Sequence, residues 1–183
     1  MAMLALAVLV AMAAWAVFAF NRLVRLRNQH RTAWSDIDVQ LQRRHDLVPQ
    51  LVAAVRGYAA HEQATLEAVT ELRAQAMSAR DPARQGEAET ALGQALGRLI
   101  ALKEAYPDLK ASENFARLSD ALVEVEEHLQ YARRFYNGAV RDYNDAIQRV
   151  PDLLVARAAG FAAAGFFQAE AGSEAAPRVE LSR

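Results

Sequence analysis

The chain has 183 residues, enough for one domain with an appendage, and it contains no cysteine. The lack of cysteine excludes disulfide bonds, thiolate metal sites and a cysteine nucleophile. The formal net charge is −1, and residues 1–20 carry no charge. Subtracting the four arginines of residues 21–31 leaves −5 for the chain after Arg31. Because no broad basic face is available, we predict that the chain does not bind nucleic acid.

The first twenty residues, MAMLALAVLVAMAAWAVFAF, predict a helix that crosses a membrane. A helix of this length spans about 30 Å, which matches one hydrocarbon core. A cleaved signal peptide carries its positive charge before the apolar run, whereas here the arginines follow it. We therefore expect residues 1–21 to form an uncleaved, single-pass transmembrane anchor.

Four arginines, which we call the basic collar, follow the apolar run directly: Arg22, Arg25, Arg27 and Arg31. Positive charge collects on the cytoplasmic side of a span, so we predict an external N-terminus and a cytoplasmic body. The collar is placed to contact anionic lipid headgroups. Alanine is frequent in the span, which leaves packing between anchors, and hence a homo-oligomer, open beside a plain span.

Residues 22–151 read as a helical bundle. Apolar residues recur every three or four positions, which is typical of helices, and no alternating run indicates a strand. Glycine and proline divide this region into four predicted helices, at about residues 22–56, 58–79, 83–105 and 112–150. Asp81 is placed to cap the third of them, with Pro82 at its first position.

Short connections make successive helices antiparallel, and the last predicted helix would be about 60 Å long. The predicted fold class is therefore all-α, with a single N-terminal transmembrane helix followed by an elongated antiparallel four-helix bundle. The first of these helices is expected to run straight on from the span.

Beyond Pro151, residues 152–170 form an apolar segment that glycines interrupt and that is too short to span a bilayer. This segment either covers the end of the bundle or dips into the membrane surface or a partner. Its large apolar residues are Leu153, Leu154, Phe161, Phe166 and Phe167. Residues 171–183 are small and polar, and we predict a disordered tail.

Residues 33–49 read AWSDIDVQLQRRHDLVP and hold a charge cluster: Asp36, Asp38, Arg43, Arg44, His45 and Asp46. On a helix, Asp36 and Asp38 lie about 200° apart, so they cannot act as a carboxylate dyad. We expect most of the cluster to form a solvated helix face that points away from the core. A surface that binds a partner is the alternative.

Arg44 is the exception in this cluster, because it falls in the apolar register between Leu41 and Val48. A buried arginine needs a carboxylate from another helix. The candidates on the last helix are Glu124, Glu126 and Glu127. Pro49 has no N–H for the carbonyl of His45, which predicts a kink and makes the freed carbonyl a candidate contact site.

No local motif indicates a catalytic, cofactor or metal site. A di-iron bundle requires Glu three residues before His, but Val125 stands three before His128. The segment HEQAT has Thr65 where a zinc protease has its second histidine. Gly93 and Gly97 fall within a helical stripe, where we expect them to permit close packing between helices. We therefore expect no enzyme and no cofactor.

Several segments together resemble the LemA family: FNRLVRLRNQHRTAWSDIDVQLQRRHDLVPQLV, GYAAHE, LGRLIALKEAYPDLKASENF, YARRFYNGAVRDYN and GFF. The resemblance covers residues 20–170, with mild departures at Gln42, Gln50 and Gly138. It implies a membrane-anchored helical bundle in the inner membrane of a bacterial cell, without an agreed biochemical activity. Family genes near membrane zinc proteases hint at such a partner. No catalytic role transfers to residues 33–49.

The predicted function is therefore that of a membrane-anchored scaffold or adaptor that binds an unidentified protein partner. The alternative is an accessory or regulatory subunit of a membrane enzyme such as a protease, and an independent enzyme is the most distant reading.

Overall fold

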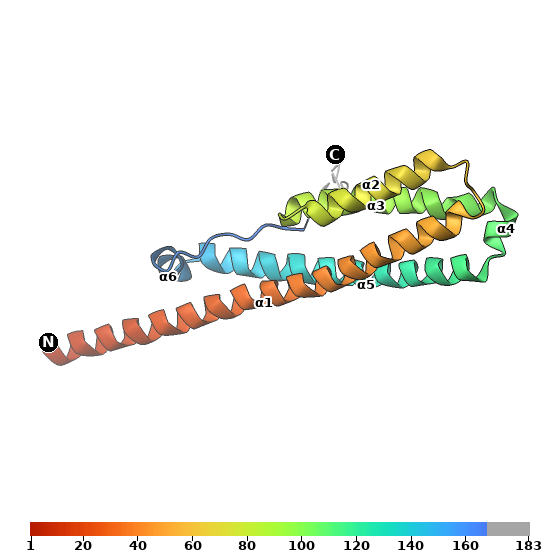
Figure 1. Cartoon of the computed structure of the whole chain (residues 1–183). Helices are drawn as coiled ribbons and strands as arrows, with labels where there is room; N and C mark the ends of the chain where they lie inside the picture. The colour runs from red at the N-terminus through yellow and green to blue at the C-terminus, as the bar shows by residue number, and fades with distance from the viewer. Residues whose placement is uncertain (168–183) are drawn as a thin grey trace, which may run out of the picture. The chain divides into compact units, whose positions relative to one another are not determined.

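The computed structural model describes residues 1–167, and within that range all regular secondary structure is helical (Figure 1). The all-α prediction is confirmed for this part of the chain. The predicted disordered tail, residues 171–183, lies outside the described residues. The described chain forms two compact units. The first unit comprises residues 1–42 and 125–166, and the second comprises residues 43–124 together with Phe167.

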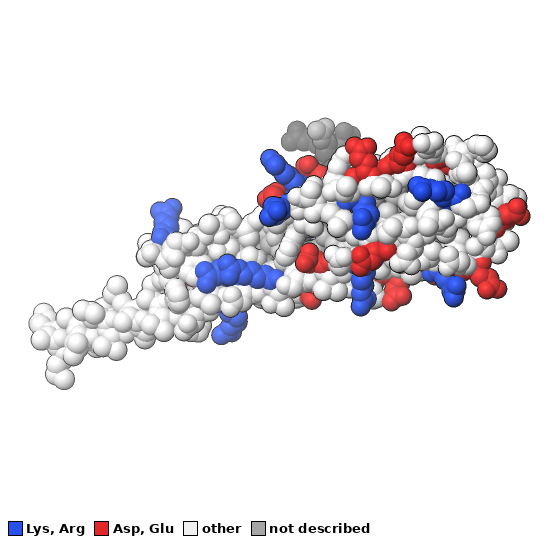
Figure 2. Space-filling view, viewed as in Figure 1, with Lys and Arg blue, Asp and Glu red and all other residues white. Residues whose placement is uncertain are grey.

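Helix α1 runs without interruption from Ala2 to Arg56, so the predicted continuation from the span into the body is confirmed. The start of α1 is rich in alanine and leucine, which have high helix propensity. Among the described residues, α1 is the one helix long and apolar enough to cross a membrane. On the face shown in Figure 2, its N-terminal part carries no charged side chain, and arginine or lysine side chains first appear beyond it.

In the first unit, α1 packs with the C-terminal part of α5 (Glu113–Gln148) and with α6 (Asp152–Ala158) (Figure 1). The core of this unit consists of Leu23, Tyr143, Ala146, Ile147 and Ala156. The sequence predicts only an apolar segment after Pro151, so α6 is an additional helix within it.

The chain after α6 is fixed to α5 by side chains that bond its backbone. Tyr143 Oη donates to the Ala162 carbonyl at 2.8 Å. The Asn144 amide both donates to and accepts from the Ala164 backbone at 2.9 Å. These bonds satisfy backbone groups that have no helical partner, so residues 159–166 lie along α5 in a defined path.

The second unit contains the C-terminal part of α1 with α2 (Gln63–Ser78), α3 (Pro82–Ala101) and the N-terminal part of α5. A 3₁₀ turn (Leu102–Glu104) and the short α4 (Pro107–Lys110) connect α3 to α5. The large apolar residues of its core include Val48, Leu51, Val55, Val69, Leu92, Leu96, Leu99 and Phe115.

Two helix boundaries differ from the prediction. Helix α2 begins at Gln63 and not near residue 58, because residues 57–62 form a turn in which Ala59 N donates to the Val55 carbonyl at 2.8 Å. Helix α3 ends at Ala101 and tightens into the 3₁₀ turn. The start of α3 is as predicted: the Asp81 side chain accepts from Arg84 N at 3.2 Å, and Pro82 is the first helical residue.

Candidate functional site

The stretch at residues 33–49 contributes to a different feature in each unit. In the second unit, Arg44 and His45 meet Glu89 of α3 and form what we call the buried ion cluster. Arg44 Nη1 donates to Glu89 Oε2 at 2.7 Å and to the Glu89 carbonyl at 2.9 Å. His45 Nε2 lies 2.6 Å from Glu89 Oε1. The side chain of Glu89 is fully buried, and those of Arg44 and His45 nearly so.

These contacts differ from the predictions at Glu89 and at His45. Arg44 is buried as predicted, and it pairs with Glu89 of α3, an acid that was not among the candidates named from the sequence. His45, which we expected on the solvated face, is buried beside it. The apolar stripe of α1 is wider here than its register suggested, because His45 lies four residues after Leu41 and three before Val48, on the same face.

The charge state of Glu89 follows from its neighbours. Burial would raise the pKa of this carboxyl, but the hydrogen bond and charge of His45, and then those of Arg44, outweigh it and hold the pKa below its usual value. The carboxylate is therefore ionised at neutral pH, and each of its oxygens already has a partner. The Glu89 carboxylate is thus paired on both oxygens and shielded from water.

Gly93, one turn after Glu89 on α3, leaves room for the guanidinium. A Cβ on Gly93 would lie 2.8 Å from Arg44 Nη2, closer than van der Waals contact allows. The predicted role of Gly93 in close packing is therefore confirmed. The same prediction for Gly97 is wrong, because that residue is exposed and no atom lies within 4 Å of the equivalent position.

The carbonyl that Pro49 frees has an internal partner. Arg73 of α2 donates from Nε to the His45 carbonyl at 2.7 Å. Pro49 lies inside α1 and supplies no N–H for this carbonyl. The candidate contact site is thus occupied by the protein itself, and the bond ties α2 to α1.

The remaining members of the charge cluster, Asp36, Asp38, Arg43 and Asp46, are exposed, as expected of a solvated face. Within residues 1–167, no group of three or more histidine, aspartate or glutamate side chains could hold a metal ion.

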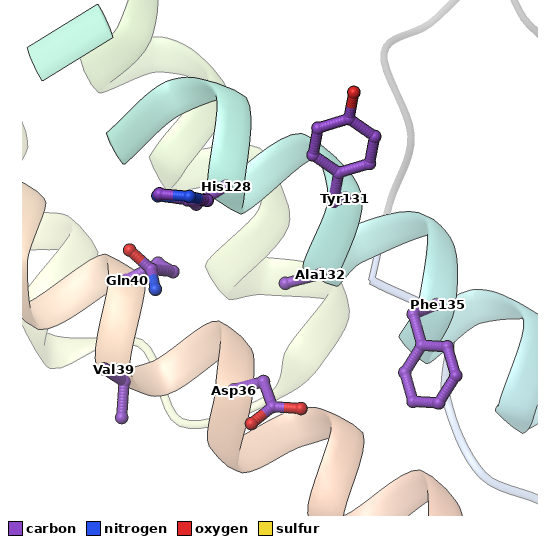
Figure 3. A pocket seen from close by; sticks show the side chains of 7 residues that line it. All are labelled: Asp36, Val39, Gln40, His128, Tyr131, Ala132 and Phe135. Atoms are coloured by element: carbon purple, nitrogen blue, oxygen red, sulfur yellow. The ribbon is translucent and has the colours of Figure 1, made fainter. Parts of the chain in front are cut away.

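In the first unit, α1 and α5 border an open groove with a volume of about 360 Å³ (Figure 3). We call it the α1–α5 groove, and it is lined by Asp36, Val39, Gln40, His128, Tyr131, Ala132 and Phe135. Figure 3 shows Gln40 and His128 pointing toward each other from the two helices, while the rings of Tyr131 and Phe135 project outward from α5.

Two properties make this groove a candidate binding surface. The aromatic rings are unusually exposed for their size, Tyr131 by 64% and Phe135 by 56%. The buried Oε1 of Gln40 has no hydrogen-bond partner among the described residues. Next to the groove, Trp34 and Tyr136 stack edge to face at 5.2 Å, which holds α1 and α5 together beneath it. Sequence reasoning assigned Asp36 to the face but gave no role to Tyr131 or Phe135.

Two arginines of the basic collar contact other residues of the first unit. Arg22 forms an ion pair with Asp152 of α6, and Arg27 stacks over the ring of Phe161 at 5.0 Å. Arg25 and Arg31 are exposed. Burial, and then the charges of Arg31 and Arg27, lower the pKa of His30, so this histidine adds no charge to the collar at neutral pH.

The described chain is thus an all-helical protein with one helix able to cross a membrane and a paired ion cluster inside its body. A family model described as the LemA family matches residues 33–181. The match covers most of the chain, and the protein belongs to the LemA family.

Curated relatives are similar over most of their length. Magnetosome protein MamQ 2 of Paramagnetospirillum magneticum is 26% identical over 185 residues, covering 87% of this chain and 68% of the relative. Magnetosome protein MamQ of Magnetospirillum gryphiswaldense is 25% identical over 193 residues, covering 90% and 71%. Protein LemA of Metamycoplasma hominis is 27% identical over 128 residues, covering 69% and 58%.

Proposed function

We propose that this LemA-family protein is a single-pass membrane protein whose cytoplasmic helical body acts by binding, as a scaffold or adaptor. In this proposal residues 1–21 are the anchor, and the second unit is an antiparallel four-helix bundle. The observation that carries the proposal is the exposed aromatic α1–α5 groove, which lies on the same helix as the candidate membrane span.

Support for the anchor comes from exposure and charge. The apolar start of α1 is almost entirely uncovered, which would be costly in water and is favourable in lipid. The arginines that follow it favour retention of the body on the cytoplasmic side.

Support for binding comes from the groove and from the buried ion cluster. Exposed tyrosine and phenylalanine beside small and polar residues are the composition of a binding hot spot. The cluster, in contrast, is buried and holds its carboxylate between two partners. The occupant we propose is a segment of a partner protein with apolar side chains and one lysine or arginine for the exposed Asp36 carboxylate.

The experiment is a comparative co-purification from gently solubilised membranes. One bait carries Tyr131→Ala and Phe135→Ala. The matched control carries Gln130→Ala and Arg141→Ala, which are exposed positions of α5 outside the groove. We expect the groove variant to lose its partner, because each hot-spot aromatic contributes about 2 kcal/mol or more, roughly thirtyfold in affinity. The control should retain it.

The identity of the bound protein decides between the scaffold and its alternative. Recovery of the chain's own copies alone supports a self-associating scaffold, whereas a stoichiometric membrane protease or transporter would favour an accessory subunit. Equal recovery by the groove variant and the control would contradict binding through the groove.

A further inference from the structure

We propose that α6 lies in the membrane interface and that the groove between α6 and the end of the span binds an anionic phospholipid, with one acyl chain in the groove and the phosphate among nearby arginines. This inference rests on the proposed membrane anchoring of α1. It assigns a role to residues 152–158, which do not line the α1–α5 groove.

The groove is apolar on both sides. Its walls are Ala16, Val17 and Phe20 of α1 and Leu154, Val155 and Ala158 of α6, and its volume is about 520 Å³. The α1 wall belongs to the uncharged run of residues 1–20. The groove is therefore continuous with the surface that the proposed span presents to lipid.

Helix α6 buries its acidic residue and exposes a leucine, whereas a helix on a surface that faces water does the opposite. Its carboxylate residue, Asp152, is buried, whereas Leu154 is 65% exposed. Ala156 is buried in the core of the first unit, so the exposed face carries Leu154, Arg157 and Ala158. Exposed apolar surface of this kind is favourable in a bilayer and unfavourable in water.

Three contacts fix α6 in this orientation. Asp152 pairs with Arg22 of the collar. The ring of Phe161, just after α6, meets Phe20 edge to face at 5.8 Å. The Arg27 guanidinium lies over the ring of Phe161, at 5.0 Å from its centroid. Because α6 is tied to α1 on both flanks, its outward leucine is a stable feature of the first unit.

The position of the groove along α1, just before the arginines of the basic collar, indicates a lipid as the occupant. Phe20 ends the apolar run, and Arg22 and Arg25 follow within about 8 Å along the helix axis. An acyl chain beside Val17 would therefore bring its phosphate to the level of these arginines. Apolar residues flanked by arginine at the cytoplasmic interface form the pattern that anionic lipids recognise.

Arginines that follow the groove-lining residues closely in sequence favour a phosphate, although none of them lines the groove itself. Arg22 keeps 42% of its side chain exposed although it pairs with Asp152. Arg25 and Arg157 are exposed as well. The nearby acids Asp142 and Asp145 border a different hollow, together with Arg22 and Arg149, and they do not line the apolar groove. Guanidinium groups bind phosphate through paired hydrogen bonds, so these arginines fit the headgroup.

Depth-dependent fluorescence quenching tests this placement. The chain has no cysteine, so Leu154→Cys creates a single site for an environment-sensitive fluorophore. The full chain is reconstituted in vesicles of phosphatidylcholine and phosphatidylglycerol that contain spin-labelled acyl chains. Leu9→Cys, within the span, is the control for anchoring. Glu127→Cys, exposed and about 30 Å along α5 from Ile147, is the control for the body.

We expect strong quenching at positions 9 and 154 and none at position 127. Quenching at position 9 without quenching at position 154 would overturn the inference and leave the anchor standing. Absence of quenching at both would overturn the anchor, and the inference with it. A groove that only a partner protein covers would leave position 154 unquenched in these vesicles.

A second variant tests the lipid itself. Ala158→Phe fills the groove from the α6 side, and Ala163→Phe is a control at an exposed position that does not line it. After purification in mild detergent, we expect the wild type and the control to retain phosphatidylglycerol in preference to phosphatidylcholine, and Ala158→Phe to lose this preference severalfold. Equal retention by all three chains would contradict a lipid in the groove.

Discussion

The buried ion cluster depends on the absence of a side chain at Gly93 as well as on the charges of Arg44 and Glu89. Two bonds to Glu89 hold the Arg44 guanidinium, so it cannot move away from a new Cβ on Gly93 without weakening them. We expect Gly93→Ala to lower the free energy of unfolding by about 1–3 kcal/mol. Gly97→Ala, on the same helix with open space around it, should raise that free energy by up to about 1 kcal/mol.

Urea unfolding of both variants in mild detergent, followed by circular dichroism, measures these two effects. A stabilising effect of similar size at both positions would show that Glu89 does not hold the guanidinium in place.

The lowered pKa of Glu89 predicts a defined pH dependence. Its pKa in the unfolded chain is near the ordinary value of 4.5, and folding lowers it. The contribution of the charged carboxylate is therefore present above about pH 4.5 and is lost as the pH falls through the lower folded value. Unfolding free energies measured across this acidic range should decrease more steeply for the wild type than for Glu89→Gln.

Glu89→Gln should also be less stable than the wild type at neutral pH, because Arg44 loses a charged partner in a buried site. If the pH profiles of the two chains run parallel, Glu89 does not titrate in the way that its contacts require.

The burial of Arg44 was predictable from the sequence, but its pairing with Glu89 was not. Helical register alone places Arg44 between Leu41 and Val48, whereas the choice of carboxylate depends on how the helices pack. A signal was present in α3, since Glu89 lies three residues before Leu92 and ten before Leu99, on the apolar stripe of that helix. An acid in an apolar stripe and an arginine in another are mutual candidates.

At the scale of elements, one hydrogen bond between α1 and α2 satisfies the carbonyl that Pro49 leaves without a helical partner. Arg73→Met should cost about 1–3 kcal/mol, because it leaves the His45 carbonyl without a donor. In a Pro49→Ala background the residue at position 49 regains its N–H, which can bond this carbonyl within the helix. We therefore expect the cost of Arg73→Met to decrease markedly there.

A double-mutant cycle in urea measures this coupling. Purely additive effects of the two substitutions would mean that Arg73 does not replace the missing N–H.

Sequence patterns predicted the elements best where local chemistry determines them. The Asp81 cap and Pro82 define the start of α3, and the continuous apolar register carries α1 from the span into the body. Helix α6 was missed because it has only seven residues and depends on Asp152 and Ala156 being buried against α1 and α5. Tertiary contacts stabilise so short a helix, and periodicity in the sequence does not report them.

For the whole molecule, the apolar run and the collar predict orientation. A fluorescent reporter fused after Arg183 should be active in the cytoplasm, and an enzyme reporter that requires export should be inactive at the same position, because positive charge favours the cytoplasmic side. A fusion that is exported and cleaved near Asn21 would instead identify residues 1–20 as a signal peptide.

Apolar periodicity predicted an all-helical chain and the uncharged N-terminal run predicted one candidate span, but neither predicted the α1–α5 groove. The α1–α5 groove joins residues up to about one hundred positions apart, from Asp36 to Phe135, and only the packing of two helices brings them together. Tyr131 and Phe135 read as ordinary members of an amphipathic helix until their exposure is known.

The most direct test of binding through this groove is site-specific photo-cross-linking in intact membranes. A photoreactive benzoylphenylalanine replaces Phe135 in one chain and Arg141, exposed on the same helix outside the groove, in another. We predict a discrete cross-linked product from position 135 and none from position 141, with loss of the product when Tyr131→Ala is added. Equal labelling from both positions, or no product from position 135, would contradict the account.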